Sequence, residues 1–167
     1  MKIKPYSLGI ITLTVIFGMV FLSDILGYWA TENKKEPSEI QTGEFTGESN
    51  PADIRGSYSF ADIENAFQVP SKILAAAFGI AESEADNFQL KSLEELYGSL
   101  AEEGTEIGTS SVRYFVALYT GLPYELTEAV YLPKQAVEIL ISQGLLSEDQ
   151  IETLKAISVD LTKSNQI

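Results

Sequence analysis

The chain contains no cysteine and no histidine among its 167 residues. These absences exclude disulfides, Cys-ligated iron–sulfur clusters, Cys-rich zinc sites, His-ligated haem, and nucleophile–base pairs built on Cys or His. Basic residues are few as well: 11 Lys and Arg stand against 24 Asp and Glu, for a formal net charge of −13. So acidic a chain lacks a surface that neutralises phosphates, and we expect no binding to nucleic acid.

The N-terminal residues differ sharply from the rest in hydropathy. Lys2 and Lys4 precede an uninterrupted uncharged run, residues 8–22. About 20 helical residues cross the hydrocarbon core of a bilayer, so residues 7–29 are long enough to predict a transmembrane helix. The positive-inside rule keeps the two lysines in the cytoplasm. We therefore predict a single-pass protein of the cell membrane, with its N-terminus cytoplasmic and its C-terminal domain extracytoplasmic.

A cleaved signal peptide is the alternative interpretation of residues 1–30. The basic start and the short apolar core suit a signal peptide. The end of the segment does not, because a small-x-small cleavage site is missing: Tyr28 stands two residues before Ala30. We prefer the retained anchor, and both interpretations place the remaining chain outside the cytoplasm.

Residues 31–52 have the composition of a tether. They contain two prolines, two glycines and few large apolar side chains. Such a segment cannot bury enough surface to offset the entropy of ordering it, so we predict a flexible linker. The alternative is an ordered coil that packs on the domain, with Ile40 and Phe45 as its anchors.

From residue 53 onward, apolar residues recur at helical spacing. We predict a compact, acidic, all-α domain over residues 53–162, followed by a frayed tail, residues 163–167. Short side-chain oxygens that accept first-turn amides mark the helix starts, for example Ser57 or Ser59 and the capping box that begins at Ser147. The expected helices cover residues 60–67, 71–78, 93–100, 112–119, 133–141 and 151–161.

The domain also repeats itself at an offset of 53 residues, as judged from matching positions. The identical pairs are Ile54 with Ile107, Ser57 with Ser110, Pro70 with Pro123, and Ala76 with Ala129. Each copy reads as an apolar residue, a polar cap, an amphipathic helix, an apolar-Pro step and a second helix. The repeat therefore predicts two stacked helix-turn-helix-like units.

Strings within these units resemble a known but uncharacterised family. DIRGSYSFADIENAF, LEELYG and EIGTSSVRYFVALYTGLPYE are similar to an extracytoplasmic helical domain of anaerobic bacteria. That domain occurs beside membrane segments of polyferredoxin-type iron–sulfur proteins and cytochrome b-like proteins. The match covers about residues 51–144 and implies an accessory role near a membrane redox protein. It carries no assigned functional residue.

Aromatic side chains crowd one stretch of the chain and form the main candidate interaction surface. They are Tyr114, Phe115, Tyr119, Tyr124 and Tyr131. The stretch leaves little polar face, and helices that are apolar on several sides lie either buried or at an interface. The alternative is that these residues belong to the core.

Arg55 and Arg113 are the only arginines, and each stands near the start of one repeat unit. We include both in the candidate surface, because a guanidinium can recognise an anion or a partner carboxylate. The structural alternative is an ion pair that ties a loop to an acidic helix, for example Arg55 with Asp53 or Asp62.

One acidic loop has the alternating oxygen ligands of a calcium loop, at Glu82, Glu84 and Asp86. Its sixth and twelfth positions, Asn87 and Leu93, lack the expected Gly and Glu. We interpret it as a solvated loop and predict neither a metal site nor a cofactor.

We predict no catalytic residues and a non-catalytic function: a membrane-anchored, extracytoplasmic interaction domain, an accessory of a membrane electron-transfer assembly. Its expected partners are the lipid bilayer and either a membrane protein or a second copy of the chain. The alternative from another class is a small-ligand-sensing domain, or a hydrolase that uses the carboxylates of Asp53, Asp62 or Glu64.

Overall fold

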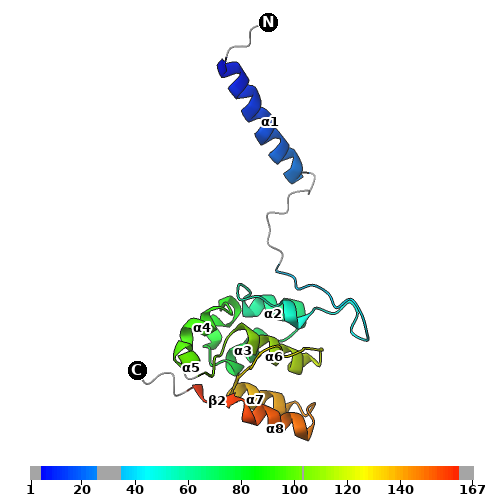
Figure 1. Ribbon diagram of the computed structural model, residues 1–167, viewed down its shortest axis with the longest axis vertical. Coiled ribbons are helices and arrows are strands. Elements are labelled where there is room, and N and C mark those ends of the chain that lie inside the picture. The colour runs from blue at the N-terminus through cyan, green and yellow to red at the C-terminus, as the bar shows by residue number, and fades with distance from the viewer. Residues whose placement is uncertain (1–4, 26–34, 103, 162–167) are drawn as a thin grey trace. The chain divides into compact units, whose positions relative to one another are not determined.

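The computed structural model describes residues 5–25, 35–102 and 104–161 (Figure 1). It divides into two units, Met1–Lys34 and Lys35–Ile167. The first unit contains helix α1 (Pro5–Ile25). Helices dominate the described part of the second unit, and its two strands have two residues each, which confirms the predicted all-α class. The predicted tail, residues 163–167, lies outside the described residues.

The predicted membrane anchor is not found among the described residues. In the part of the chain that the structure describes, no helix combines the length and the apolar character needed to cross a bilayer. The prediction relied on one continuous span from residue 7 to residue 29, and residues 26–29 of that span lie outside the described residues. Tyr28 and Ala30, which decided against a signal peptide, lie outside the described residues. The finding contradicts the predicted single-pass location in the cell membrane.

Residues 35–50, predicted to be part of the flexible linker, form a hairpin within the second unit, the N-terminal hairpin hereafter. Its arms meet at an antiparallel bridge between Glu39 and Ser49. The Ile40 amide donates to the Glu48 carbonyl at 2.8 Å. Pairing of this kind satisfies the backbone N–H and C=O groups of a polar segment without a large apolar core. Composition does not reveal such pairing, and for this reason it predicted a tether.

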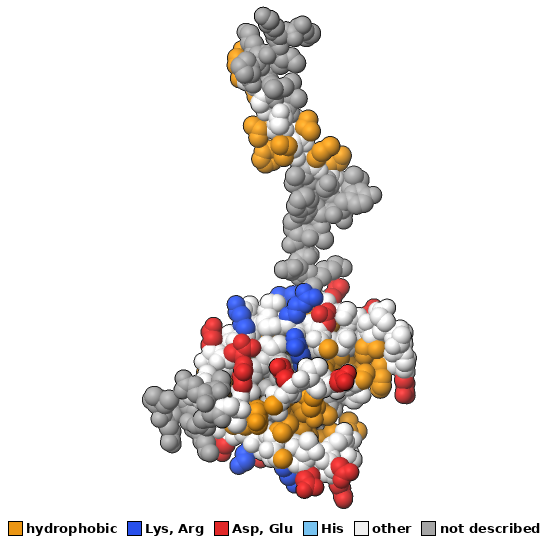
Figure 2. All heavy atoms as spheres, in the orientation of Figure 1, with side chains coloured by type: hydrophobic (Ala, Val, Ile, Leu, Met, Phe, Trp, Pro, Cys, Tyr) orange, Lys and Arg blue, Asp and Glu red, His pale blue; other side chains and the backbone are white. Residues whose placement is uncertain are grey.

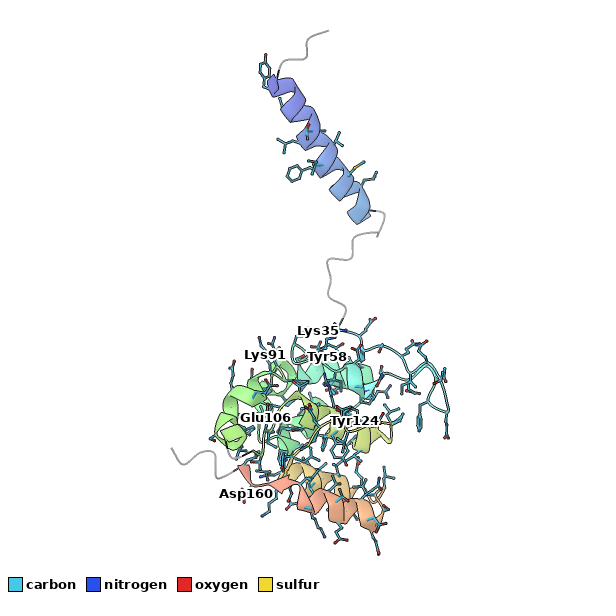
Figure 3. All side chains as sticks on the ribbon, viewed as in Figure 1. Lys35, Tyr58, Lys91, Glu106, Tyr124 and Asp160 are labelled. Atoms are coloured by element: carbon cyan, nitrogen blue, oxygen red, sulfur yellow. The ribbon has the colours of Figure 1, made fainter. Side chains whose placement is uncertain are left out.

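Two carboxylates of the domain hold the N-terminal hairpin in place. Lys35 Nζ lies 2.8 Å from Asp62 Oδ2, at the edge of the domain where Figure 3 labels the lysine. The Ser38 amide donates to Asp53 Oδ2 at 2.8 Å, and Pro37 is buried. The hairpin is therefore an ordered wall of the domain, as in the alternative interpretation, but its expected anchors, Ile40 and Phe45, are only half-buried and do not belong to the core.

Helices α2 (Phe60–Phe67) and α3 (Ser71–Ala77) form the predicted helix pair. A reciprocal capping box begins α2: the Ser59 side chain accepts the amide of Asp62, and the Asp62 carboxylate accepts the Ser59 amide. The helix ends at Gln68, whose φ of 57° is left-handed. Helix α3 lies at the centre of the domain and packs against α2, the short helix η2 (Glu82–Asn87) and α7 (Lys134–Ser142) (Figure 1).

Short helices connect this pair to the rest of the domain. The predicted helix over residues 93–100 is broken in two at Tyr97, whose buried hydroxyl donates to the Phe78 carbonyl at 2.7 Å. The predicted loop before it contains a 3₁₀ turn that buries Ala85. The elements are η1 (Pro51–Asp53), η2 (Glu82–Asn87), α4 (Ser92–Leu96) and α5 (Gly98–Glu102).

The second half of the domain is built on α6 (Thr109–Thr120), which ends at Gly121 with a φ of 74°. Further along the chain, β1 pairs with β2 in parallel, with Leu132 opposite Ser158. The Ser147 capping box is present and begins α8. The remaining elements are β1 (Leu132–Pro133), α7 (Lys134–Ser142), α8 (Glu148–Ala156) and β2 (Ser158–Val159).

The predicted repeat is present only in part. Ile54 and Ile107 are both fully buried, and α2 corresponds to α6. However, residues 122–131, which should match α3, contain no helix. The second helix-turn-helix-like unit is therefore absent, and a non-helical segment takes its place.

A chain of aromatic rings joins the two halves. Phe60, Phe78 and Phe115 are all fully buried. Their ring centroids lie 6.4 Å apart for Phe60 and Phe78, and 5.8 Å apart for Phe78 and Phe115. Contacts of this kind bury large apolar surfaces and stabilise one relative placement of the helices.

Candidate functional site

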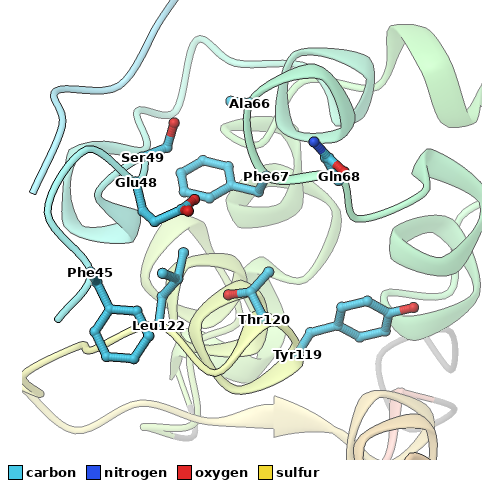
Figure 4. Close-up of a pocket in the computed structure, with 9 residues that line it drawn as sticks. All are labelled: Phe45, Glu48, Ser49, Ala66, Phe67, Gln68, Tyr119, Thr120 and Leu122. Atoms are coloured by element: carbon cyan, nitrogen blue, oxygen red, sulfur yellow. The ribbon is translucent and has the colours of Figure 1, made fainter.

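An open groove of about 520 Å³ lies between the N-terminal hairpin and the C-terminal ends of α2 and α6 (Figure 4). We name it the aromatic groove, because three of its lining side chains are aromatic. Its lining residues are Phe45, Glu48 and Ser49 from the hairpin; Ala66, Phe67 and Gln68 from the end of α2; and Tyr119, Thr120 and Leu122 from the end of α6.

Local backbone geometry opens the groove at the end of α2. Gln68 adopts the left-handed conformation, with φ 57° and ψ 26°, and its amide donates to the Glu64 carbonyl at 2.8 Å. This conformation costs an L-residue with a Cβ about 1–2 kcal/mol. Val69 then turns into the core, where it is fully buried. The chain therefore leaves α2 abruptly, and the exposed Gln68 side chain remains on the groove wall.

The floor of the groove is connected to the core through α6. The Tyr119 ring lies 5.7 Å from the Phe115 ring, centroid to centroid. The Thr120 hydroxyl donates to the Val116 carbonyl at 2.7 Å, so it is satisfied within the helix. Phe45 and Tyr119 stand at opposite ends of the row of lining side chains in Figure 4. A rigid helix thus presents one end of the groove and the hairpin presents the other.

Polar and apolar atoms share the lining of the groove, and its one charged residue is acidic. Glu48 is the one lining residue with a charged side chain at neutral pH, and none of the lining residues is Lys or Arg. Ser49 and Gln68 supply neutral polar atoms. Figure 2 shows apolar side chains gathered near the C-terminal end of α6, with acidic side chains at the margin. A lining of this kind offers contacts to both apolar and polar groups of a ligand.

The structure separates the aromatic residues of the predicted surface. Phe115 is fully buried in the core. Tyr114 and Tyr124 are half-buried and form a ring pair 6.3 Å apart, and Tyr131 is half-buried against the core. Of the five, Tyr119 lines the aromatic groove.

Neither arginine of the predicted surface lines the groove. Arg113 Nε donates to the Ile54 carbonyl at 2.8 Å, which fastens α6 to the turn after η1. The exposed Arg55 lies 3.3 Å from Asp53 Oδ1, the ion pair considered from the sequence. Phe45, by contrast, belongs to the groove although it was predicted only as an anchor for the segment before residue 53. Its isolation as a large apolar side chain in a polar stretch is the signal that marks it.

The carboxylates considered for hydrolysis serve the fold. The amide of Ser38, bonded to Asp53, lowers the pKa of that carboxyl. Burial by itself would raise the pKa of Asp62, but hydrogen bonds from Lys35 and Ser59 outweigh it and leave the pKa lowered. A general acid near neutral pH needs a raised pKa. Neither carboxyl is therefore tuned for that role.

The acidic loop at η2 is also held by its neighbours. Lys72 Nζ lies 2.6 Å from Glu82 Oε1, and the Ser71 hydroxyl donates to Asp86 Oδ1 at 2.6 Å. No group of three acidic residues placed to hold a metal ion is found among the described residues.

A smaller recess of about 130 Å³ lies at the start of α6. The carboxylates of Glu94 and Glu128 accept hydrogen bonds from the hydroxyls of Thr109 and Ser110, respectively. Carboxylates at a helix N-terminus complement the partial positive charge of the helix dipole. The chain's own side chains thus provide the anions that this end of α6 favours.

Comparison with known proteins adds no relative. No protein-family model, no curated protein and no solved structure matches the chain.

Proposed function

We propose that this chain is a non-catalytic interaction domain that binds a polypeptide segment of a partner in the aromatic groove. The observation that carries the proposal is the groove itself, in which Phe45, Tyr119 and Leu122 are only half-buried. Binding energy in protein interfaces concentrates where a few side chains insert into a desolvated pocket. An aromatic or leucine side chain from a partner would complete the burial of these residues.

A neighbouring segment supports a polypeptide as the ligand. Residues 122–131 leave the end of α6 without forming a helix, and their backbone groups make no hydrogen bond to another described residue. Side chains alternate at its start: Leu122 and Tyr124 are half-buried, whereas Pro123 and Glu125 are exposed. An alternating segment with unpaired backbone groups is a template for an added strand.

Two sources of that polypeptide deserve the first tests. The resemblance of residues 51–144 to domains found beside membrane redox proteins makes such a protein one candidate. A second copy of this chain is the other. The small-ligand alternative lacks a comparable argument, since the groove is open and carries a single charged side chain.

Selection of displayed peptides tests the proposal. Full-length chain would be challenged with a phage library of random peptides, and enriched peptides would be measured against Phe45→Ala. Phe45 lies on the hairpin and outside the buried core, so its truncation should leave melting unchanged. We expect affinity to fall about 30-fold, which corresponds to a hot-spot contribution of about 2 kcal/mol.

Leu145→Ala is the matched control. Leu145 is 72% exposed and does not line the groove, so its truncation removes apolar surface elsewhere. The selected peptides should bind this variant as they bind the wild type. Peptides that bind Phe45→Ala with unchanged affinity, or a library that yields no binder, would refute the proposed site.

A further inference from the structure

We infer that the segment bound in the aromatic groove is cationic, with Lys or Arg residues next to an aromatic or leucine side chain. This inference rests on the proposed function and adds the chemistry of the partner. It follows from the charges that border the groove rather than from the groove's shape.

The hairpin side of the groove carries an excess of carboxylates. Glu39, Glu44 and Glu48 are exposed on the N-terminal hairpin, and Glu48 lines the groove directly. The one basic residue of the hairpin, Lys35, is 2.8 Å from the Asp62 carboxylate and is neutralised by it.

The chain that leaves the groove at the end of α6 adds no compensating charge. Leu122 lines the groove, and the next charged residue along the chain is the exposed Glu125. None of the lining residues is Lys or Arg, so a ligand in the groove meets carboxylates and no basic side chain of the lining. Each exposed pair contributes only about 0.2–1 kcal/mol, but complementary charges together select partners and raise the association rate.

The charge also decides between the two candidate partners. A second copy of the chain has the same net charge of −13, and like charges placed across an interface cost binding energy. A positively charged segment of another protein is favoured instead. Apolar side chains at every second position of that segment would match the alternation of half-buried and exposed side chains at residues 122–125.

Three capped peptides of equal length test the inference against the full-length chain. They share the pattern X-Phe-X-Leu-X-Phe-X, with X as Lys, Glu or Ser, and fluorescence anisotropy reports their affinity. At low salt we expect the Lys peptide to bind at least about 10-fold more tightly than the Glu peptide. The difference should shrink to about 3-fold or less near 0.5 M salt, where the screening length is only a few ångströms.

Two substitutions of one charge each locate the attraction. Glu48→Gln, in the groove lining, should weaken the Lys peptide about 3-fold, in line with one exposed ion pair. Glu152→Gln changes the net charge equally, but Glu152 is exposed on α8 and does not line the groove, so it should leave the affinity unchanged.

The outcomes separate this inference from the proposed function. If the Ser and Glu peptides bind as tightly as the Lys peptide and still depend on Phe45, the cationic partner is wrong and the groove stands. If the Lys peptide binds Phe45→Ala unchanged, or if Glu48→Gln and Glu152→Gln weaken it equally, general charge attraction explains the binding and the inference fails. If no peptide of any charge binds, both proposals fall.

Discussion

Replacing Asp53 with alanine should release the N-terminal hairpin without unfolding the core. Asp53 Oδ2 accepts the Ser38 amide at 2.8 Å, and Oδ1 lies 3.3 Å from Arg55 Nη2. The substitution removes both contacts and leaves the second fastening, between Lys35 and Asp62, in place. Because the hairpin forms one wall of the aromatic groove, its release would also change the proposed binding site.

The magnitude follows from these contacts. A hydrogen bond to a charged group contributes about 1.5–3 kcal/mol, and an exposed ion pair adds about 0–1 kcal/mol. The Asp53 side chain is 28% exposed, so solvent screening favours the low end of the range. A loss of about 1.5 kcal/mol corresponds to a roughly tenfold rise in the fraction of open hairpin.

Native-state hydrogen exchange measures this opening directly. The amides of Ile40 and Asn50, which donate within the hairpin, should exchange about tenfold faster in Asp53→Ala. The amides of Leu74 in α3 and of Phe78, the residue after that helix, should keep their wild-type protection, and Glu152→Ala should change neither group. Equal acceleration of hairpin and core, or unchanged hairpin exchange, would refute the reasoning.

The same contact predicts an acid dependence. The Ser38 amide lowers the pKa of Asp53 in the folded state, whereas the unfolded value is about 3.9. A lowered folded pKa means that the stabilisation is present above the unfolded pKa and is lost as pH falls through the folded pKa. Hairpin protection in the wild type should therefore fall in acid. We expect the Asp53→Ala variant to show a smaller acid-induced fall in hairpin protection than the wild type. We assign the fall that remains to Asp62, whose pKa is also lowered.

Three further substitutions test the packing. Tyr97→Phe leaves the buried Phe78 carbonyl without its 2.7 Å donor and should lower the free energy of unfolding, measured in urea, by about 1–3 kcal/mol. Tyr58→Phe removes a hydroxyl that bonds no other described residue and should lower it far less. Equal losses in the two variants would contradict the stabilising role of the Tyr97 hydroxyl. Gln68→Gly should raise the free energy of unfolding by up to about 1 kcal/mol, because glycine tolerates the left-handed φ of 57°, and a decrease would argue against strain there. Phe115→Ala, at a fully buried position, should cost about 3–5 kcal/mol, and a loss under 1 kcal/mol would place that ring outside the core.

Helix positions were largely predictable because their signals are local. The hydroxyls of Ser59 and Ser147 cap α2 and α8 by accepting the backbone amides three residues further on, and Gly121 ends α6 with a positive φ. Such signals act within one turn of the chain, so they can be read without knowledge of the fold. The all-α class followed from them.

The groove was only partly predictable. Tyr119 was expected at a binding surface and Phe45 at an anchor, yet the sequence does not show that they share one site, since they are far apart along the chain. The apolar pattern likewise does not show that Phe115 turns to the core while Tyr119 turns to the groove. These assignments depend on which elements pack against α6.

Local sequence thus determines where helices begin and end, because capping and periodicity involve neighbours along the chain. Tertiary structure decides three other features: the order of residues 35–50, the non-helical path of residues 122–131, and the parallel pairing of Leu132 with Ser158. Each depends on contacts between distant residues, such as Ser38 with Asp53, whose closure entropy is offset only when the whole domain packs. The aromatic groove exists because those distant segments meet.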